Sequence, residues 1–400
     1  MPYVKPQEIR VSVDVGCHQH SIAIGLSTGE LLDEFDIEHK SSGFKSFFKR
    51  IEHWEKHYKA SVSVAMEGYN GYARPLDRLI RVRNYRLYNI NNLKLARFKE
   101  IFPGAAKTDP IDARKGLELF QLSDQLPLAK GVLQEIASTP KENEHLKRMT
   151  RRRRRLVNER ASIINALQSD LQAVSPGITE ITKDVNNMWF INFLSSSPDL
   201  RKLARKRRSS LLKIRGVGKK YADKIEHWQQ QAFFSDEIDI VSPMIHEDGL
   251  RIIELNENIK QLNAHIEQLN DRSEISTILR SIPGFGTTSC AEIAGEMGTI
   301  ERFAGESSLA LYLGMAALDN SSGSHKGSKK PKHVNTRAKA ALMVAVDRHR
   351  KLVPESQRYY DKKRNEGKKH NQAIRSLGRH LTRVIYKMLL NGNVYEVKKL

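Results

Sequence analysis

The stretch Ile9-Arg10-Val11-Ser12-Val13-Asp14-Val15-Gly16 alternates apolar and polar residues and ends close to a carboxylate. A period of two predicts a β-strand with one buried face. Two more strands are predicted at 20–26 and 30–37, joined by a turn at 27–29. A helix at 44–58, a strand at 62–66, a helix at about 72–82 and a strand at 85–90 follow. Three strands and then alternating helices and strands predict an α/β layer with a mixed sheet.

Four acidic residues stand out against these elements. Asp14 and Glu67 end two predicted strands, and Asp109 and Asp112 lie three residues apart in Lys107-Thr108-Asp109-Pro110-Ile111-Asp112. Carboxylates near a core are costly unless a cation or a partner balances them. Converging carboxylate oxygens favour Mg²⁺. Asp109 and Asp112 also fit the cap and first turn of a helix with Pro110 at its first position, and the two roles are compatible.

Composition restricts the class of partner. The 400 residues carry a net charge of +21 and a pI of about 9.8, which favours binding to nucleic acid or to an acidic membrane surface. No apolar run approaches the ~20 residues of a membrane-spanning helix. The N-terminus shows no signal-peptide pattern, and two cysteines make no disulfide framework, so we expect a cytoplasmic protein. An acidic metal site in a basic chain predicts chemistry on a phosphodiester backbone.

The positive charge is concentrated in blocks. From Ser324 to Leu400 the chain has 21 Lys and Arg against 5 Asp and Glu, a difference of +16. Two more blocks are the five arginines at 151–155 and the six basic residues at 201–208. One such block alone is as well explained by a solvated helix face. Together they favour phosphate contacts.

Long helices are predicted in the middle of the chain, over about 143–174 and 249–278. The second carries Ile252, Leu255, Ile259, Leu262, Ile266 and Leu269. This spacing of three and four is a heptad seam with Ile at a and Leu at d, which is typical of two-stranded coiled coils. Two arrangements would bury the apolar residues of this seam: a hairpin with the first helix, or a dimer with a second chain.

Two Gly-x-Gly turns are candidates for helix-hairpin-helix elements. One is Ile282-Pro283-Gly284-Phe285-Gly286, followed by a helix predicted at 289–297, and the other is Ile214-Arg215-Gly216-Val217-Gly218. Glycines at such turns allow main-chain amides to approach a phosphate. Further along, a Ser- and Gly-rich loop follows Tyr312, and helices are predicted at about 336–350 and 371–390. Between these helices, Tyr359 and Tyr360 either stack on bases or pack.

These motifs together resemble a known family. Asp14, Glu67 in Met66-Glu67-Gly68, and the Asp109/Asp112 pair resemble the DEDD motif of the IS110-type insertion-sequence transposases, and the order of strands and helices resembles the ribonuclease H-like (RuvC-like) fold. The segments 282–286, 312–314 and 321–323 resemble the C-terminal transposase domain of that family. The resemblance implies a RuvC-like DEDD domain over 1–130, a helical coiled-coil region over 131–278 and a mostly α-helical transposase domain over 279–400.

The resemblance also implies an activity. Such proteins are DNA recombinases that mobilise their own element, and a structured non-coding RNA, the bridge RNA, guides them to donor and target DNA. The four acids would bind Mg²⁺, with Mn²⁺ as a substitute, and act in catalysis. Ser322, rather than Ser321, would be the nucleophile that links to DNA. The working form would be a homodimer or tetramer in the bacterial cytoplasm, associated with the nucleoid and not with a membrane.

Some features depart from the family pattern, and two other functions remain open. Cys17 and His18 stand where many relatives have a lysine, and we interpret His18 and His20 as strand residues rather than metal ligands. A glycine-containing stretch is missing around 334–337.

The runner-up function is a Holliday-junction-resolvase-like nuclease, which hydrolyses with water. A non-catalytic RNA-binding protein is the third, against which the four intact acids argue.

Overall fold

A computed structural model of the chain describes residues 7–67, 71–100, 109–123, 132–316, 318–319, 328–329, 331 and 334–396. The chain forms two compact units, Met1–Ser138 and Thr139–Leu400. The division predicted near residue 278 lies inside the second unit and stays a prediction. Among the described residues, no helix is both long enough and apolar enough to cross a membrane.

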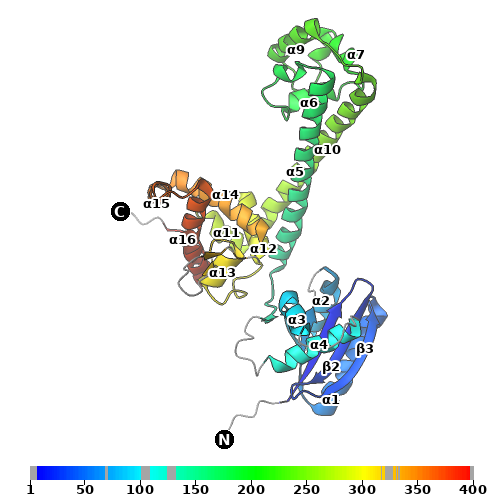
Figure 1. Cartoon of the computed structure of the whole chain (residues 1–400), viewed down its shortest axis with the longest axis vertical. Helices are drawn as coiled ribbons and strands as arrows, with labels where there is room; N and C mark the ends of the chain where they lie inside the picture. The colour runs from blue at the N-terminus through cyan, green and yellow to red at the C-terminus, as the bar shows by residue number, and fades with distance from the viewer. Residues whose placement is uncertain are drawn as a thin grey trace. The chain divides into compact units, whose positions relative to one another are not determined.

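The first unit is built on a six-stranded mixed sheet with the order β3-β2-β1-β4-β5-β6 (Figure 1). β1 pairs in parallel with β4, and β4 with β5, whereas the remaining pairs are antiparallel. Its strands are β1 (Glu8–Val15), β2 (Gln19–Leu26), β3 (Leu31–Glu38), β4 (Ser61–Glu67), β5 (Arg86–Ile90) and β6 (Leu133–Glu135). Its helices are α1 (Ser41–Tyr58), the 3-10 helix η1 (Gly71–Ala73), α2 (Arg74–Val82), α3 (Asn92–Lys99) and α4 (Asp109–Leu122).

The two faces of this sheet are covered by different helices. Val11 and Val13 of β1 pack in one core cluster with Phe47 of α1 and Leu76 of α2. Helix α4 packs against β1, β2 and β4, and its Leu117 joins a second cluster. Because successive strand residues point to opposite faces, the alternation seen in the sequence assigns each side chain of β1 to one of these layers. The predicted mixed α/β layer is confirmed, and its ribonuclease H-like identity stays a prediction.

The second unit begins with a long helical hairpin. Helix α5 (Lys141–Val174) packs along α10 (Ile238–Asn270) with the chain running in opposite directions. Leu156, Leu255 and Ile259 are buried together between the two helices. The apolar seam of the second helix is therefore covered within one chain, and a dimer through this seam stays a prediction. We call this pair of helices the arm.

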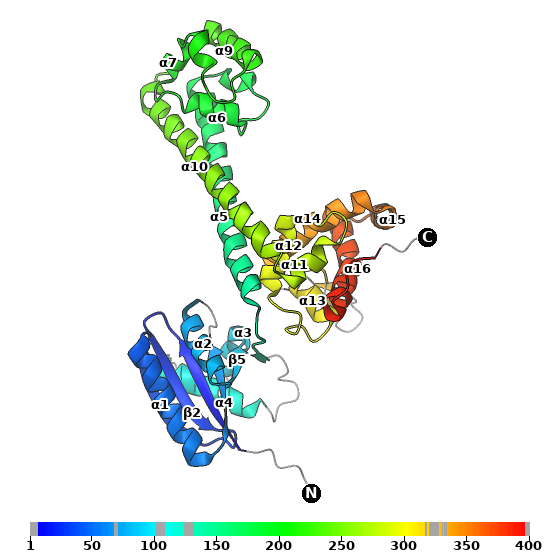
Figure 2. The same ribbon diagram turned by 180° about the vertical axis from the view of Figure 1, so that it is seen from behind.

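A small helical domain, which we call the tip, joins the two helices of the arm. It contains η3 (Ile178–Ile181), α6 (Met188–Leu194), α7 (Leu200–Ala204), α8 (Arg208–Leu211) and α9 (Lys219–Gln231). Its core includes Phe190, Phe193 and Trp228 from the tip and Leu171 from α5. At the opposite end of the arm lies a helical bundle formed by the C-terminal third (Figure 2).

The bundle at the base of the arm contains most of the remaining elements. They are α11 (Glu274–Arg280), α12 (Thr287–Met297), α13 (Glu306–Tyr312), α14 (Thr336–Leu352), α15 (Pro354–Asn365), α16 (His370–Asn391) and the short strands β7 (Leu318–Asp319) and β8 (Ser328–Lys329). α12 lies so close to α5 that a Cβ on Gly295 would stand 2.5 Å from the Lys147 nitrogen. Small residues therefore allow the bundle to pack on the arm.

The predicted bounds of the second long helix were wrong at both ends. α10 begins at Ile238 rather than 249 and continues past Pro243. It ends at Asn270 rather than 278, because the hydroxyl of Ser273 accepts a hydrogen bond from the Ser276 amide and caps α11. Tyr359 and Tyr360 lie in a helix, α15, where Tyr360 is buried, so packing explains at least that ring.

Candidate active site

Asp14 and Glu67 end two neighbouring strands and belong to the same face of the sheet. β1 and β4 are parallel, with Asp14 opposite Glu67 in the register. Their preceding residues, Val13 and Met66, are buried in the core that contains α1. Because side chains alternate along a strand, Asp14 and Glu67 belong to the other face, which α4 covers.

Helix α4 runs antiparallel to β1 across this face. Near its C-terminal end, the carbonyl of Phe120 accepts a 2.5 Å hydrogen bond from Nη1 of Arg10, close to the start of β1. Halfway along, Gly116 passes Ser12 so closely that an added Cβ would lie 2.4 Å from the Ser12 hydroxyl. The first turn of α4 therefore reaches the carboxyl end of β1.

Asp112 lies in that first turn. It precedes Gly116 by four residues, so it is on the same side of the helix as the close contact with β1. Asp14 follows Ser12 by two residues and is on the same face of the strand. Along β1, Arg10 is level with Phe120 of α4, and Ser12 is level with Gly116. Because the helix and the strand run in opposite directions, the next step brings Asp112 to the level of Asp14. Asp112 is buried, with 9% of its surface exposed.

The sequence interpretation missed Lys99, the last residue of α3. Its Nζ lies 2.9 Å from Oε2 of Glu67 and 3.1 Å from Oδ1 of Asp112. Burial works to lower the pKa of Lys99, but the hydrogen bonds and charges of both carboxylates outweigh it and raise the pKa. Lys99 therefore supplies the cation that two largely buried carboxylates require. The available signal was its place in the helix that follows β5, the strand next to β4.

The donor atoms of this site fit Mg²⁺ by type. Asp14, Glu67 and Asp112 offer carboxylate oxygens, which hard divalent cations prefer. The Lys99 ammonium balances the charge of two of these carboxylates. Among the residues whose side chains are described, no three His, Cys, Asp or Glu form a group that could hold a metal ion. The Asp109 side chain lies outside that set.

The two histidines near the first strand have different positions. His20 lies in β2, as predicted, whereas His18 precedes the strand. The His20 ring is buried, and its Nε2 lies 2.8 Å from Nδ1 of His39. Burial and the charge of His39 lower the pKa of His20 to about 4. His20 is therefore neutral at pH 7, and its ring packs against His39 and Phe44.

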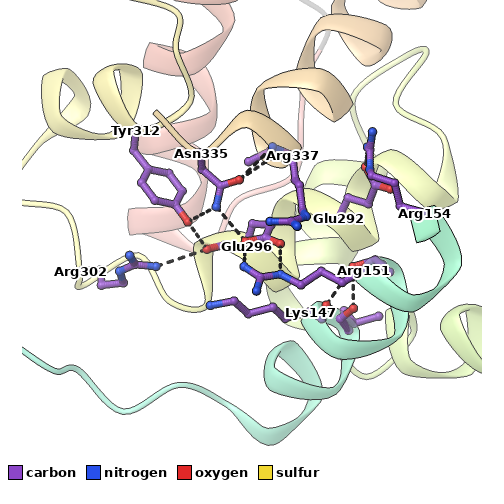
Figure 3. Close-up of polar contacts among 12 residues, drawn as sticks. Lys147, Arg151, Arg154, Glu292, Glu296, Arg302, Tyr312, Asn335 and Arg337 are labelled. Carbon is purple, nitrogen blue, oxygen red and sulfur yellow. Dashed lines mark hydrogen bonds and ion pairs between the residues drawn. The ribbon is translucent and has the colours of Figure 1, made fainter. Parts of the chain in front are cut away.

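A buried polar cluster in the second unit joins α12, α5 and the start of α14 (Figure 3). At its centre is Glu296, whose side chain is 1% exposed. Arg151 donates to both of its oxygens at 2.7 and 2.8 Å, and Nδ2 of Asn335 donates to one of them at 2.7 Å. Burial works to raise the pKa of Glu296, but Arg151 and Asn335 outweigh it and lower the pKa. Glu296 is therefore ionised at neutral pH.

The same cluster fixes the two flanks of the Ser- and Gly-rich segment. Tyr312, which ends α13, donates its hydroxyl to the Glu296 carbonyl at 2.5 Å. Asn335, the cap of α14, donates from its main-chain nitrogen to the Tyr312 carbonyl at 2.8 Å and from Nδ2 to the Tyr312 hydroxyl at 2.7 Å. Ser321 and Ser322 lie between these flanks, outside the described residues.

Comparisons with known proteins match two separate stretches of the chain. A family model described as "Transposase" (DEDD_Tnp_IS110) matches residues 11–176, and a model described as "Transposase IS116/IS110/IS902 family" matches residues 276–361. The chain belongs to the IS110 family of transposases. Membership of this family implies an enzyme that cuts and rejoins DNA.

Proteins of three insertion elements resemble this transposase. The IS110 43.6 kDa protein of Streptomyces coelicolor is 27% identical over 327 residues, or 76% of each chain. The IS116 44.8 kDa protein of Streptomyces clavuligerus is 24% identical over 307 residues, or 75% of each chain. The IS900 42 kDa protein of Mycobacterium paratuberculosis is 35% identical over 126 residues, which are 31% of this chain and 32% of that protein.

A basic cleft of about 780 Å³ opens beside the flanks of the Ser- and Gly-rich segment in the transposase. Met315 and Ala316 line it on one flank, and Pro331 and Val334 on the other. Its cationic and imidazole side chains are Lys339, Lys363, Lys368, Arg375, Arg379 and His380. Burial and nearby cations lower the pKa of His380, so this ring adds no charge at pH 7. Lys363 and Lys368 pair with Glu366, and Arg379 pairs with Glu306, so Lys339 and Arg375 are the cations of the cleft best placed to hold phosphate groups.

Three arginines of the block at 151–155 have partners within the chain. Besides Arg151, Arg153 donates to Oδ1 of Asn263 at 2.6 Å, and Arg154 pairs with Glu292. These three side chains therefore have partners in the folded chain, and phosphate contact by the block stays a prediction. Arg152 and Arg155 are exposed and remain candidates.

Proposed function

We propose that this transposase cuts and rejoins DNA strands through a covalent link between Ser322 and DNA. Asp14, Glu67, Asp109 and Asp112 would hold Mg²⁺, or Mn²⁺ as a substitute. The observation that supports the proposal is the register of Asp14 opposite Glu67 at the carboxyl ends of β1 and β4, together with Lys99, which joins Glu67 to Asp112. A ribonuclease H-like first domain would explain this placement.

The chemistry follows from a weak nucleophile and a charged phosphodiester. Bound Mg²⁺ would supply Lewis-acid polarisation of the scissile phosphate. The Ser322 hydroxyl loses its proton to a base and forms an oxygen–phosphorus bond, and the bond from phosphorus to the leaving sugar oxygen breaks. That sugar oxygen takes up a proton. The number of phosphodiester links is conserved, so rejoining requires no ATP.

A structured RNA from the element is proposed as the guide that pairs with donor and target DNA. In this arrangement base pairing reads sequence, and the protein contacts backbone and shape. The net charge of +21 and the basic cleft support such contacts. A homodimer or tetramer would bring several active sites to the two DNA partners.

A trapping assay tests this function. The transposase, Mg²⁺, RNA transcribed from the flank of its element and labelled donor DNA are mixed and separated on a denaturing gel. A labelled band at protein mass is expected, and it should disappear in the Ser322→Ala and Asp14→Ala variants. Ser321→Ala is the matched control and should retain the band.

The same gel separates the competing functions. Free cleaved DNA without a covalent band would instead support a metal-dependent nuclease of the Holliday-junction-resolvase kind. A band that depends on Ser321 rather than Ser322 would move the nucleophile by one residue. Omitting the RNA should abolish the band, and a band that persists without RNA would contradict guidance.

A further inference from the structure

The two Gly-x-Gly hairpins have the same main-chain geometry. Each begins with a left-handed glycine, Gly216 at φ 86° or Gly284 at φ 85°. Two residues later, Gly218 or Gly286 forms the extended N-cap of the next helix. In both turns the amide between the glycines donates to the isoleucine carbonyl three residues earlier, at 3.0 and 3.1 Å. The weaker copy in the sequence is thus a structural equivalent of the stronger one.

The equivalent hairpins lie at opposite ends of the arm (Figures 1 and 2). The second joins α11 and α12 in the bundle at the base, and the first joins α8 and α9 in the tip. α10, with 33 residues, separates them along ~50 Å at ~1.5 Å per residue. Residues 177–275 fall between the two family models, so neither model covers the tip hairpin.

The tip carries a concentrated positive surface. Residues 200–222 contain ten Lys and Arg and no Asp or Glu. Arg201 and Arg208 form ion pairs with acids outside that stretch, and Lys206 is half-buried. The other seven are exposed, and none forms an ion pair with any residue that the structure describes; they are Lys202, Arg205, Arg207, Lys213, Arg215, Lys219 and Lys220. Unpaired cations at this density favour a polyanionic partner.

Gly218 lies at the exposed N-cap of α9 and leaves open space on its outer side. A Cβ built on Gly216 would lie 3.1 Å from the Cβ of Trp189, and its φ is positive, so the fold itself requires that glycine. Gly218 has a negative φ, and its Cβ would meet nothing within 4 Å. The fold therefore does not require glycine at 218. A close approach by a ligand backbone is a reason to have one.

The aromatic rings beside the hairpin argue for a duplex rather than a single strand. Proteins that bind single strands present aromatic faces to unstacked bases. Tyr221, directly after the hairpin, instead stacks on Trp189 with ring centroids 4.2 Å apart and an angle of 12°. The exposed groups of the hairpin are thus charges, which suit a phosphate backbone.

We infer that the tip hairpin is a second DNA-binding surface, which holds the phosphate backbone of duplex DNA remote from the bundle. The choice of DNA rests on the proposed function, since that function places duplex DNA on the protein. Lys213, Arg215, Lys219 and Lys220, which fall within eight residues, supply the charge. Gly218 leaves room for the backbone.

The test measures binding of a labelled duplex of about 30 base pairs by fluorescence anisotropy, in EDTA, over a range of salt concentrations. A variant with all four hairpin cations changed to Gln should bind at least about tenfold more weakly at physiological salt. The slope of log K against log salt should fall by about 2 to 4, since each lost phosphate contact removes about 0.9. Gly218→Ala should weaken binding about threefold or more and lower the melting temperature by no more than about 4 degrees, since alanine caps a helix less well than glycine.

A matched control removes four exposed lysines on and beside α1, through Gln at Lys45, Lys49, Lys56 and Lys59. It should retain the affinity and slope of the unmodified protein. Duplex binding that is unchanged in both the hairpin variant and Gly218→Ala would overturn the inference. A loss confined to structured RNA would assign the surface to RNA and overturn the choice of DNA.

Failure of this inference can be distinguished from failure of the proposed function. Binding in EDTA requires no strand cleavage, so the result does not depend on Ser322 or on metal. A protein that forms no covalent band but loses duplex affinity in the hairpin variant would retain the tip site and lose the serine mechanism.

Discussion

Lys99 places a permanent positive charge between Glu67 and Asp112, at the point where the proposed metal would bind. Replacing it with Met removes the cation and leaves the carboxylates unbalanced. We predict that Lys99→Met lowers the free energy of unfolding of the metal-free protein by about 1 to 2 kcal/mol, a discounted value because the side chains are partly exposed. Added Mg²⁺ should then stabilise the variant more than the unmodified protein.

Thermal unfolding with and without Mg²⁺ measures this difference directly. The buffers contain no Ca²⁺. The control is Lys94→Met, which removes an exposed lysine from the same helix. It separates binding of Mg²⁺ at the carboxylates from the general effect of losing one positive charge. An equal Mg²⁺ shift in all three proteins would contradict a cation site at these carboxylates.

Glu296 is predicted to make the second unit sensitive to acid. Its pKa is lowered from an ordinary value of 4.5, so its ionised form favours the folded state. That contribution is complete above about pH 4.5 and is lost as the pH falls through the lowered value. Glu296→Gln should cost roughly 2 to 3 kcal/mol at pH 7, since Arg151 loses its buried partner.

Denaturant unfolding between pH 3 and 7 checks both parts of this prediction. The variant should show a shallower decline of stability below about pH 4.5 than the unmodified protein. Parallel declines in the two proteins would mean that other carboxylates govern acid unfolding.

At the scale of elements, the contact between α4 and β1 is predicted to depend on one glycine. A Cβ on Gly116 would lie 2.4 Å from the Ser12 hydroxyl but 3.6 Å from the Ser12 Cβ. Gly116→Ala should therefore destabilise the first unit by about 1 to 3 kcal/mol, a typical cost of overpacking. Removing the hydroxyl with Ser12→Ala in the same chain should restore most of that loss.

The double-mutant cycle is the measurement, with chemical unfolding of all four proteins. A strictly additive result would show that α4 is not held against β1 at this point. Restored stability with weakened Mg²⁺ binding would indicate that the small shift of the helix is felt at Asp112.

The same elements show how far sequence reasoning reached. The strands at 9–15, 20–26 and 62–66 were predicted from side chains that alternate along the chain. That alternation is visible because different helices cover the two faces of the sheet. Asn91 caps α3, since its side chain accepts a hydrogen bond from the Lys94 amide, and asparagine is a preferred residue at this position. The start of α10 was missed, because Pro243 reads as a break whereas buried contacts of Ser242 with the tip carry the helix through it.

The site was predictable in part. Asp14 and Glu67 could be found because strand ends are visible in a hydrophobic pattern. Lys99 could not, because its contacts join α3 to β4 and α4, and no local sequence pattern encodes the packing of these three elements. The short helices of the tip lack a long apolar period, so within residues 178–231 only the hairpin at 214–218 was predicted, without bounds for its helices.

At the scale of the whole molecule, each unit has its own core. The clusters around Phe47 and Leu117 belong to the first unit, and those around Phe190 and Leu342 to the second. We predict two calorimetric transitions, one lowered by Gly116→Ala and the other by Glu296→Gln. A single transition that both substitutions shift equally would contradict two cooperative units.

The arm has a consequence for how chains of this kind can vary in length. α5 leaves the bundle and α10 returns beside it, and Arg251 donates to Glu159 at 3.0 Å on the way. If both helices ended at the level of this contact, their ends would be neighbours. A loop of about 2 to 5 residues could then join them. The outer part of the arm and the tip would then be a separable module. An insertion element could lengthen, trade or discard this module while the remaining parts of its transposase keep their own folds.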